Sequence, residues 1–285
     1  MILVTGATGN VGSALIQQLS AAGIPSRALV RSEEKAQQVT AANVETVTGD
    51  MSQTVQMAAA LEGVSKLFLL SPLEPTMPAL QQQVIELAKQ TGVQQVVKLS
   101  VENADAQSNL SVDRWHGEVE QFLAASDLAW TNLQPGYFMQ NLLMSASTIR
   151  AQNCFFAPRD EMTTAIDARD IAAAAFSVLT SGGHENKTYR LTGAKAISYS
   201  EMMEQLSQVL GRQIKLVQIS QSDYRQGLVD TGMPDWLVDS LMEMVKAPPQ
   251  TPCIEDTISV LTGRSPILFR QFATDHAEYF VKSDE

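Results

Sequence analysis

The sequence begins with an apolar run that passes directly into a glycine-rich turn. Residues 1–5 (Met-Ile-Leu-Val-Thr) predict a buried parallel strand, and residues 13–22 predict a helix with its larger apolar side chains on one face. Between them lies the turn 6–12, Gly-Ala-Thr-Gly-Asn-Val-Gly. A strand, a glycine-rich turn and a helix in this order form the unit that binds the pyrophosphate of a dinucleotide.

Each glycine of this turn has a physical reason. Gly6 lets the chain turn tightly off the strand, Gly9 lets phosphate oxygens approach the backbone N–H groups, and Gly12 lets the helix pack close to the strand. The helix N-terminus adds free N–H donors and a partial positive charge. The spacing is G-x-x-G-x-x-G rather than G-x-G-x-x-G, so the context carries the prediction, and a tight turn without a ligand is the alternative. The turn residues that we expect to bind the cofactor are Gly6, Thr8, Gly9, Asn10, Val11 and Gly12.

An arginine follows the second predicted strand, residues 26–30. Arg31 lies 19 positions after Gly12, where an acidic residue would bind the ribose 2′-hydroxyl of NAD. An arginine at this position suits the 2′-phosphate of NADP, so the sequence favours NADP(H) over NAD(H). Arg27 and Lys35 add positive charge in the same region. The alternative is that Arg31 is a solvated residue that pairs with a neighbouring glutamate.

Predicted strands and helices alternate regularly over the first 135 residues. Further strands are predicted at 44–47, 66–71, 95–100 and 130–133, with one more at 187–191. This alternation predicts an α/β fold of the Rossmann type, with a doubly wound parallel sheet. The later chain is mostly helical and predicts a smaller C-terminal lobe that covers the substrate. We expect the nucleotide-binding domain at 1–150 and 164–194, and the lobe at 151–163 and 195–285.

Polar residues follow several of the predicted strands, at the sheet edge where ligands of open α/β sheets collect. Asp50 is expected to accept from the adenine amino group, or to cap the helix that begins near Gln53, while Met51 packs on the ring. Further cofactor-binding candidates at these strand ends are Ser71, Pro72 and Ser100. Later in the chain, Asp170 is expected to cap the helix that ends near Leu179.

A run of Pro, Gly and aromatic residues follows the predicted strand 130–133. Pro135, Gly136 and Tyr137 are expected to line the nicotinamide half of the cofactor, and Phe138 and Met139 to shape an acceptor pocket. Tyr137 is also a candidate catalytic residue. The alternative is that the two aromatic residues only attach the following helix to the core.

Composition excludes several classes of protein. The net charge of −11 argues against direct binding of nucleic acid, whose phosphates require Lys and Arg. Two cysteines make no disulfide framework, and no Cys/His spacing indicates a metal site. No signal peptide and no membrane span is evident, so we expect a cytoplasmic protein. The expected partner is a small-molecule acceptor, and a homodimer or a protein partner stays open.

Several runs together resemble the NmrA-like group of atypical short-chain dehydrogenases/reductases. These are Val4-Thr-Gly-Ala-Thr-Gly-Asn-Val-Gly12, Pro135-Gly-Tyr-Phe-Met-Gln-Asn141, Asp167-Ala-Arg-Asp-Ile-Ala172 and Gly183-His-Glu-Asn-Lys-Thr-Tyr189. The resemblance covers essentially the whole chain. It implies a relation to NADPH-dependent quinone reductases, a triphenylmethane-dye reductase and a cofactor-sensing regulator.

One departure from ordinary short-chain dehydrogenases bears on the chemistry. By position, Val112 replaces the tyrosine and His116 the lysine of the family's Tyr-x-x-x-Lys pair. Because quinones and cationic dyes accept hydride directly, the resemblance implies an NADPH-dependent reductase that works without this pair. His116 is then the leading candidate for a proton donor, although it could also be a structural helix residue. The alternative function is a non-catalytic NAD(P) sensor that acts through a protein partner.

Overall fold

The computed structural model describes residues 1–281 and divides into two compact units. The first unit comprises Met1–Pro135, Ala168–Leu191 and Val260–Gly263, and the second comprises Gly136–Asp167, Thr192–Ser259 and the chain from Arg264 onward. Each unit has a hydrophobic core of its own. They are described one after the other.

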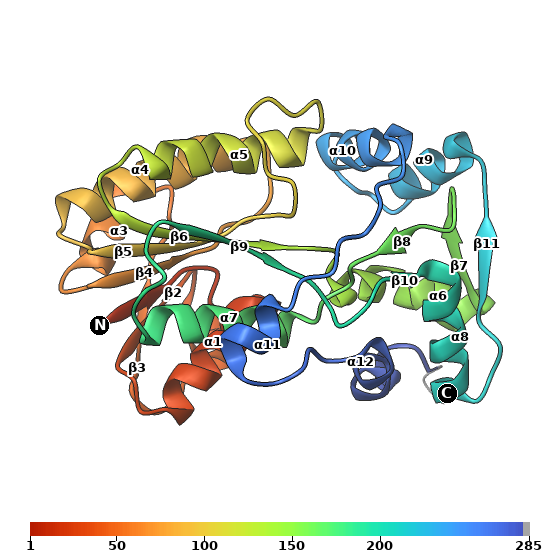
Figure 1. The fold of residues 1–285 in the computed structure, drawn as a ribbon, viewed down its shortest axis with the longest axis horizontal. Coiled ribbons are helices and arrows are strands. Elements are labelled where there is room, and N and C mark those ends of the chain that lie inside the picture. Colours follow the sequence, from red (N-terminus) through yellow and green to blue (C-terminus); the bar gives the residue numbers. More distant parts are fainter. Residues whose placement is uncertain (282–285) are drawn as a thin grey trace. The chain divides into compact units, whose positions relative to one another are not determined.

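The first unit is built on a seven-stranded sheet whose neighbouring strands all run parallel (Figure 1). Its strands are β1 (Ile2–Val4), β2 (Ser26–Val30), β3 (Val44–Thr48), β4 (Lys66–Leu69), β5 (Gln95–Leu99), β6 (Ala129–Pro135) and β9 (Lys187–Leu191). The order β3-β2-β1-β4-β5-β6-β9 reverses direction between β1 and β4, which is the switch point of a doubly wound fold. The predicted Rossmann-type fold is therefore confirmed.

Helices cover both faces of this sheet (Figure 1). One face carries α3 (Thr54–Leu61), α4 (Met77–Gln90) and α5 (Ser111–Ala124), and the other carries α1 (Asn10–Ala21) and α7 (Ala168–Thr180). The short α2 (Glu33–Gln38) connects β2 and β3. The α3–α5 face packs leucine, valine and methionine side chains against Leu3, Leu67 and Val96 of the central strands. Burial of this apolar surface stabilises the sheet and fixes where each strand ends.

The second unit is mostly helical and contains two small sheets. Its helices are α6 (Ala146–Gln152), α8 (Tyr199–Leu210), α9 (Gln221–Asp230), α10 (Asp235–Lys246) and α12 (Phe269–Asp275), with 3₁₀ segments η1 (Met139–Ser145) and η2 (Ala277–Tyr279). Strand β7 (Cys154–Ala157) pairs with β11 (Lys215–Gln218), and β8 (Met162–Thr163) pairs with β10 (Ile197–Ser198). Helix α8 begins at a capping box in which Ser198 and Glu201 satisfy each other's backbone N–H groups. Helix α11 (Thr257–Thr262) contributes residues to both units.

Two expectations from the sequence differ from the structure. The first segment of the first unit ends at Pro135 rather than at residue 150, because the segment from Met139 to Ile149 packs into the core of the second unit. Helix α7 begins at Ala168, so Asp170 lies in its first turn and is not the N-cap. A carboxylate in the first turn still favours the helix, because it faces the partial positive charge of the N-terminus.

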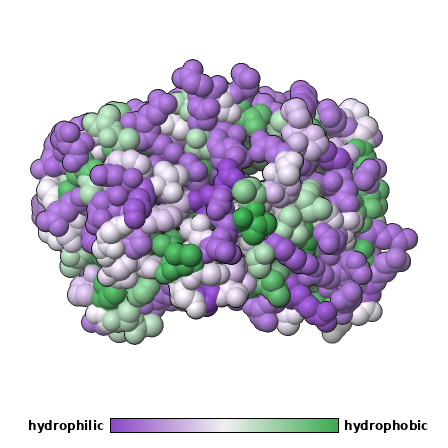
Figure 2. Space-filling model, in the orientation of Figure 1, coloured by the Kyte–Doolittle hydropathy of each residue, from purple (hydrophilic) through white to green (hydrophobic). Residues whose placement is uncertain are grey.

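The exposed surface is largely polar on the face shown in Figure 2. Large apolar side chains that are exposed, such as Val55, Met144 and Val260, come from separate elements. Scattered apolar residues of this kind are normal on a protein surface. Among residues 1–281, the structure contains no helix that is long and apolar enough to span a membrane.

Candidate active site

The glycine turn joins β1 to α1 at the carboxyl edge of the central sheet. Thr5 accepts a hydrogen bond from the Leu70 N–H and donates to main-chain oxygens of β4 and its extension, which fixes the ends of β1 and β4. Gly6 has a φ of 62°, in the left-handed region that favours glycine. A Cβ on Gly12 would lie 2.2 Å from the Gly6 carbonyl oxygen, so only glycine fits where the helix meets the turn.

The N-terminus of α1 presents backbone donors to the outside. Its N-cap is Gly9, which has no side chain to satisfy the first N–H groups of the helix. Thr8, Gly9 and Asn10 are exposed, whereas Val11 and Gly12 are buried beneath them. Exposed donors at a helix N-terminus form a site for an anion such as a pyrophosphate. The residues of this turn therefore fit a dinucleotide, which is the ligand that the order of strand, glycine turn and helix predicts.

Arg31 follows β2 directly, and its side chain is exposed. Within residues 1–281 the structure contains no ion pair of Arg31 with Glu33 or Glu34. The prediction that Arg27 adds positive charge for a ligand near Arg31 is wrong, because its guanidinium bonds Glu45 and the carbonyl oxygens of Ala60 and Glu62. Arg31 is thus the residue at this strand end whose charge is available to a ligand.

Asp50 lies two residues beyond the end of β3. Its Oδ1 accepts from the Ser52 N–H and hydroxyl, both at 2.8 Å, and these bonds together with the charge of Arg31 lower the pKa of Asp50 below its ordinary value. The expected cap of the following helix is not formed, because the N-cap of α3 is Gln53 and Asp50 closes the turn before it. The carboxylate stays ionised at the sheet edge, beside the nearly buried Met51.

The remaining strand-end candidates of the first unit differ in their surroundings. Ser71 accepts from Gln81 Nε2 at 2.9 Å, and the following Pro72 is exposed. Ser100 is 2% exposed, and its hydroxyl has no hydrogen-bond partner among residues 1–281. Buried polar atoms are rarely left unpaired, and each exception calls for an explanation such as a missing ligand.

His116 lies on α5, one helical turn after Val112, and contacts a buried lysine. Lys98 of β5 is completely buried, and its Nζ lies 2.8 Å from Nδ1 of His116. Burial lowers the pKa of Lys98 to about 7, although the charge of Glu120 acts in the opposite direction and raises it. Burial and the neighbouring lysine hold the pKa of His116 well below its ordinary value. The imidazole is therefore neutral at neutral pH, and its Nδ1 accepts from the ammonium group.

A second layer of polar residues surrounds this pair. Glu120, one turn further along α5, accepts from Gln134 Nε2 on both carboxylate oxygens at 3.1 Å. Asn132 of β6 stands opposite Lys98 in the strand register, and its buried Oδ1 has no partner. The Lys98–His116 pair thus belongs to a polar cluster at the carboxyl ends of β5 and β6.

The candidates beyond the sixth strand are divided between the units. Pro135 is the last residue of the first segment of the first unit, whereas Gly136, Tyr137, Phe138 and Met139 belong to the second unit. Main-chain hydrogen bonds with Ile166 hold this segment, from Ile166 N to the Tyr137 oxygen and from Met139 N to the Ile166 oxygen. Met139 is 2% exposed and lies in the core of the second unit. Its role in an acceptor pocket stays a prediction.

Tyr137 belongs to an aromatic cluster inside the second unit. Its ring centroid lies 6.0 Å from that of Tyr199, which in turn makes an edge contact with Phe155 at 5.2 Å. Burial first, and then the neighbouring tyrosines, raise the pKa of Tyr137 well above its ordinary value. The phenol therefore keeps its proton at neutral pH and can donate a hydrogen bond.

Lys98 is the site residue that sequence reasoning did not single out. It interrupts the apolar strand 95–99, and a single charge in a strand that is otherwise buried requires a partner. That pattern is visible in the sequence. The partner is not, because His116 lies 18 positions further on and is brought to the lysine only by the packing of α5 on the sheet.

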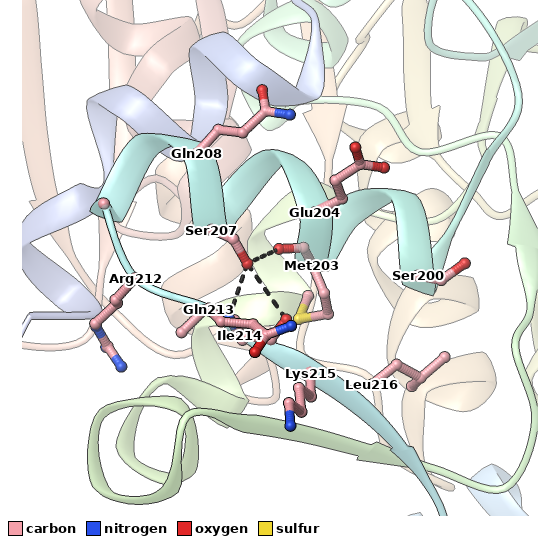
Figure 3. A pocket seen from close by; sticks show the side chains of 11 residues that line it. Ser200, Met203, Glu204, Ser207, Gln208, Arg212, Gln213, Ile214, Lys215 and Leu216 are labelled. Carbon is pink, nitrogen blue, oxygen red and sulfur yellow. Dashed lines mark hydrogen bonds between the residues drawn. The ribbon is translucent and has the colours of Figure 1, made fainter.

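A groove on the second unit lies apart from all these candidates (Figure 3). It has a volume of about 720 Å³ and runs along α8 and the segment that leads into β11. Ser207 joins the two walls, since it accepts from the Ile214 N–H and bonds the Met203 oxygen (Figure 3). Within residues 1–281, no group of three or more His, Cys, Asp or Glu side chains is placed to hold a metal ion.

Known proteins resemble this chain over nearly its full length. The model of the NmrA-like family matches residues 1–262. An NAD(P)H azoreductase of Xenophilus azovorans is 40% identical, over 98% of this chain and 99% of its own. The NADPH complex of a quinone oxidoreductase of Escherichia coli superimposes with a TM-score of 0.83 at 30% identity, over 96% of this chain and 99% of that one. The NADP(H) complex of a Citrobacter triphenylmethane reductase gives 0.84 at 25% identity, over 97% and 100%.

Proposed function

The chain belongs to the NmrA-like family and is an NAD(P)H-dependent oxidoreductase, and on that premise we propose that it transfers hydride from NADPH to a small conjugated acceptor. The observation that carries this proposal is the β1–α1 turn. Gly6 and Gly12 shape it, and the exposed N-terminus of α1 offers its free N–H groups to a pyrophosphate.

The preference for NADPH over NADH rests on Arg31. Arg31 directly follows β2 and has an exposed side chain, at the strand end where a dinucleotide in this fold places its adenosine ribose. A 2′-phosphate there would accept charge-assisted hydrogen bonds from the guanidinium. Asp50 and Met51 are assigned to the adenine, and Ser71, Pro72, Ser100 and Pro135 to the remaining cofactor-binding positions.

The acceptor class follows from the chemistry that the relatives' names share. An azo compound, a quinone and a triphenylmethane dye are all conjugated molecules with an electrophilic centre that accepts hydride. Such acceptors need less help from a general acid than a ketone does, which suits a chain with Val112 and His116 at the positions of the usual dyad. We assign Tyr137, Phe138 and Met139 to acceptor binding.

When it is bound, NADPH supplies the hydride. The protein's own groups bind, orient and protonate. The α1 N-terminus and Arg31 would hold the two phosphate-bearing ends of the cofactor, while Tyr137 keeps its proton and donates hydrogen bonds. His116, neutral and with its Nδ1 directed at Lys98, presents an Nε2–H as a donor.

The test is NADPH oxidation by the purified protein across quinones, azo dyes and triarylmethane dyes, with NADH measured in parallel. We expect turnover with several conjugated acceptors, and a higher kcat/KM for NADPH than for NADH. Binding of NADPH is measured in the same sample by fluorescence. Tight binding without turnover on any acceptor would contradict the reductase and favour the sensor that acts through a protein partner.

A further inference from the structure

A lysine in the interior of the first unit is costly. Lys98 is 0% exposed, and an ammonium group removed from water is disfavoured unless other groups compensate. Its Nζ contacts His116 Nδ1 at 2.8 Å and, more weakly, the Leu99 carbonyl oxygen at 3.4 Å. The Glu120 carboxylate acts on it only through its charge. A methionine would fill the same space without this cost, so the charge itself needs a reason.

The geometry of the pair fixes the tautomer of the histidine. An ammonium group has only donors, so Nδ1 of His116 must accept and the ring hydrogen must reside on Nε2. The imidazole is then a bridge, with a proton source on one nitrogen and a donor on the other. Such an arrangement can pass a proton along without the ring ever holding a full positive charge.

The surroundings place this bridge beside a ligand site. Lys98 lies at the carboxyl end of β5, the edge where ligands of open parallel sheets bind. Two residues later, Ser100 has a buried hydroxyl, and Asn132 on the neighbouring strand has a buried Oδ1, and neither atom has a hydrogen-bond partner in the described part of the chain. Loop 101–110 covers α5 so closely that a Cβ on Gly117 would lie 2.2 Å from the Ala106 nitrogen. The cluster is therefore shielded from water on the side of this loop.

We infer that Lys98 is the proton reservoir of the reductase and that the proton reaches the reduced acceptor through His116. This inference rests on the proposed function and adds a positioning residue to it. It applies to acceptors that take up a proton along with the hydride, such as quinones and azo compounds. A triarylmethane cation needs no proton, because hydride addition alone makes the neutral product.

The reduction of a quinone consumes one proton as well as one hydride. The quinone takes a hydride from NADPH, which leaves as NADP⁺, and becomes a hydroquinone anion. The His116 Nε2–H bond breaks as the new O–H bond forms, and Nδ1 of the same ring takes a proton from the Lys98 ammonium. After product release, solvent returns a proton to Nε2 and the ring returns the Nδ1 proton to the lysine. One quinone, one NADPH and one solvent proton are consumed.

The charged groups around the pair set the direction of its pH dependence. On α5 itself Glu120 favours the ammonium form of Lys98, although burial has the larger effect and lowers the pKa to about 7. Burial raises the pKa of Asp113 to about 6, and the carboxylates of Asp105 and Glu102 in the covering loop raise it further in the same direction. Facing residues Asn132 and Gln134 of β6 are uncharged. Quinone reduction should therefore fall as pH rises through about 7, where the ammonium loses its proton.

The experiment compares two acceptors, duroquinone and crystal violet, in the wild type, Lys98→Met and His116→Gln. We expect both substitutions to lower the ratio of quinone to dye turnover about 10- to 100-fold, within the range of general acid catalysis. The fall in quinone turnover above neutral pH should disappear in Lys98→Met. The wild type should show a solvent deuterium isotope effect on duroquinone and none on crystal violet.

The matched control is Lys66→Met. Lys66 starts the neighbouring strand β4, and its Nζ bonds the Leu179 carbonyl oxygen at 2.7 Å, away from the carboxyl edge. Its substitution should leave the acceptor ratio and the pH profile unchanged. Parallel loss on both acceptors in the Lys98 and His116 variants would overturn the relay while leaving the reductase intact. A wild type that binds NADPH and reduces neither acceptor would overturn both.

A second readout uses the wild type without cofactor or acceptor. The chain has three histidines, so the ¹⁵N NMR signals of the His116 ring are those that remain in both His184→Gln and His276→Gln. We expect an Nε2–H tautomer across neutral pH, with an Nδ1 shift that titrates near the pKa of Lys98, about 7, and is absent in Lys98→Met. An Nδ1–H tautomer, or a ring that protonates at its ordinary pKa, would overturn the relay even if the substituted proteins failed to fold.

Discussion

Arg31 and Asp50 lie just beyond the ends of the neighbouring strands β2 and β3, and their exposed side chains carry opposite charges. Together they set the charge that the adenosine ribose of a bound dinucleotide would face. Changing Arg31→Asp removes charge-assisted bonds worth about 1.5–3 kcal/mol and adds repulsion toward a phosphate. We expect the Kd for NADPH to rise about 10- to 100-fold and that for NADH to change little. Fluorescence titration with each cofactor measures this. Lys89→Gln, which removes an exposed charge on α4, is the control, and an unchanged NADPH affinity in Arg31→Asp would refute the assignment.

Single residues were predictable where the backbone dictates them. Gly6 and Gly12 are demanded by a turn in which a Cβ has no room, and this demand is local. The environment of His116 was not predictable, because it depends on Lys98 in another element. The expected help from Arg27 failed for the same reason, since its partners Glu45, Ala60 and Glu62 come from β3 and the end of α3.

At the scale of elements, the β1–α1 unit depends on one close approach. A Gly12→Ala substitution puts a methyl group 2.2 Å from the Gly6 carbonyl oxygen, so the helix must move away from the turn. Overpacking of this kind costs about 1–3 kcal/mol, and the displaced helix N-terminus no longer meets the phosphates. We expect a lower Tm by circular dichroism and a Kd for NADPH at least about 10-fold higher. Gly182→Ala is the control, because a Cβ added at Gly182 would have no atom within 4 Å apart from those of its chain neighbours. This substitution should change neither the Tm nor the Kd for NADPH.

The elements of the first unit and the mostly helical character of the second were predicted from the sequence, whereas the pairing of the short strands in the second was not. Buried parallel strands such as β1 are continuous apolar runs, and helices such as α4 and α5 show a clear apolar stripe. The strands β7 and β8 of the second unit have only four and two residues, which is too short to show a period. Their pairing partners, β11 and β10, lie far along the chain, so only the tertiary structure reveals them.

At the scale of the whole molecule, cofactor binding should stabilise the unit that holds the glycine turn. Trp115 and Trp130 lie in the first unit and Trp236 in the second, so the variant Trp236→Phe has tryptophan fluorescence from the first unit alone. At 100 times its Kd, NADPH adds about 2.7 kcal/mol, which corresponds to a rise in Tm of about 5–10 °C. The same titration on Trp236→Phe combined with Gly12→Ala should show little shift. No shift in Trp236→Phe itself would mean that NADPH does not bind to the first unit.

The division into two units was only partly predictable. The sequence predicts a nucleotide-binding domain with an additional lobe, and it places the first boundary between them at residue 150. The structure puts it at Pro135, because Met139, Leu142, Ala146 and Ile149 bury their side chains in the second core. Which core an amphipathic segment joins is decided by packing over long sequence distances, and its own periodicity does not show it.

The path of the chain also limits how a protein of this plan can diversify. The chain passes from one unit to the other five times, at 135/136, 167/168, 191/192, 259/260 and 263/264. A genetic recombination event that joins two genes at a single point therefore transfers neither unit whole. New acceptor preferences must arise by point substitutions and short insertions within the second unit, while the segments that carry the nucleotide-binding unit are inherited around them.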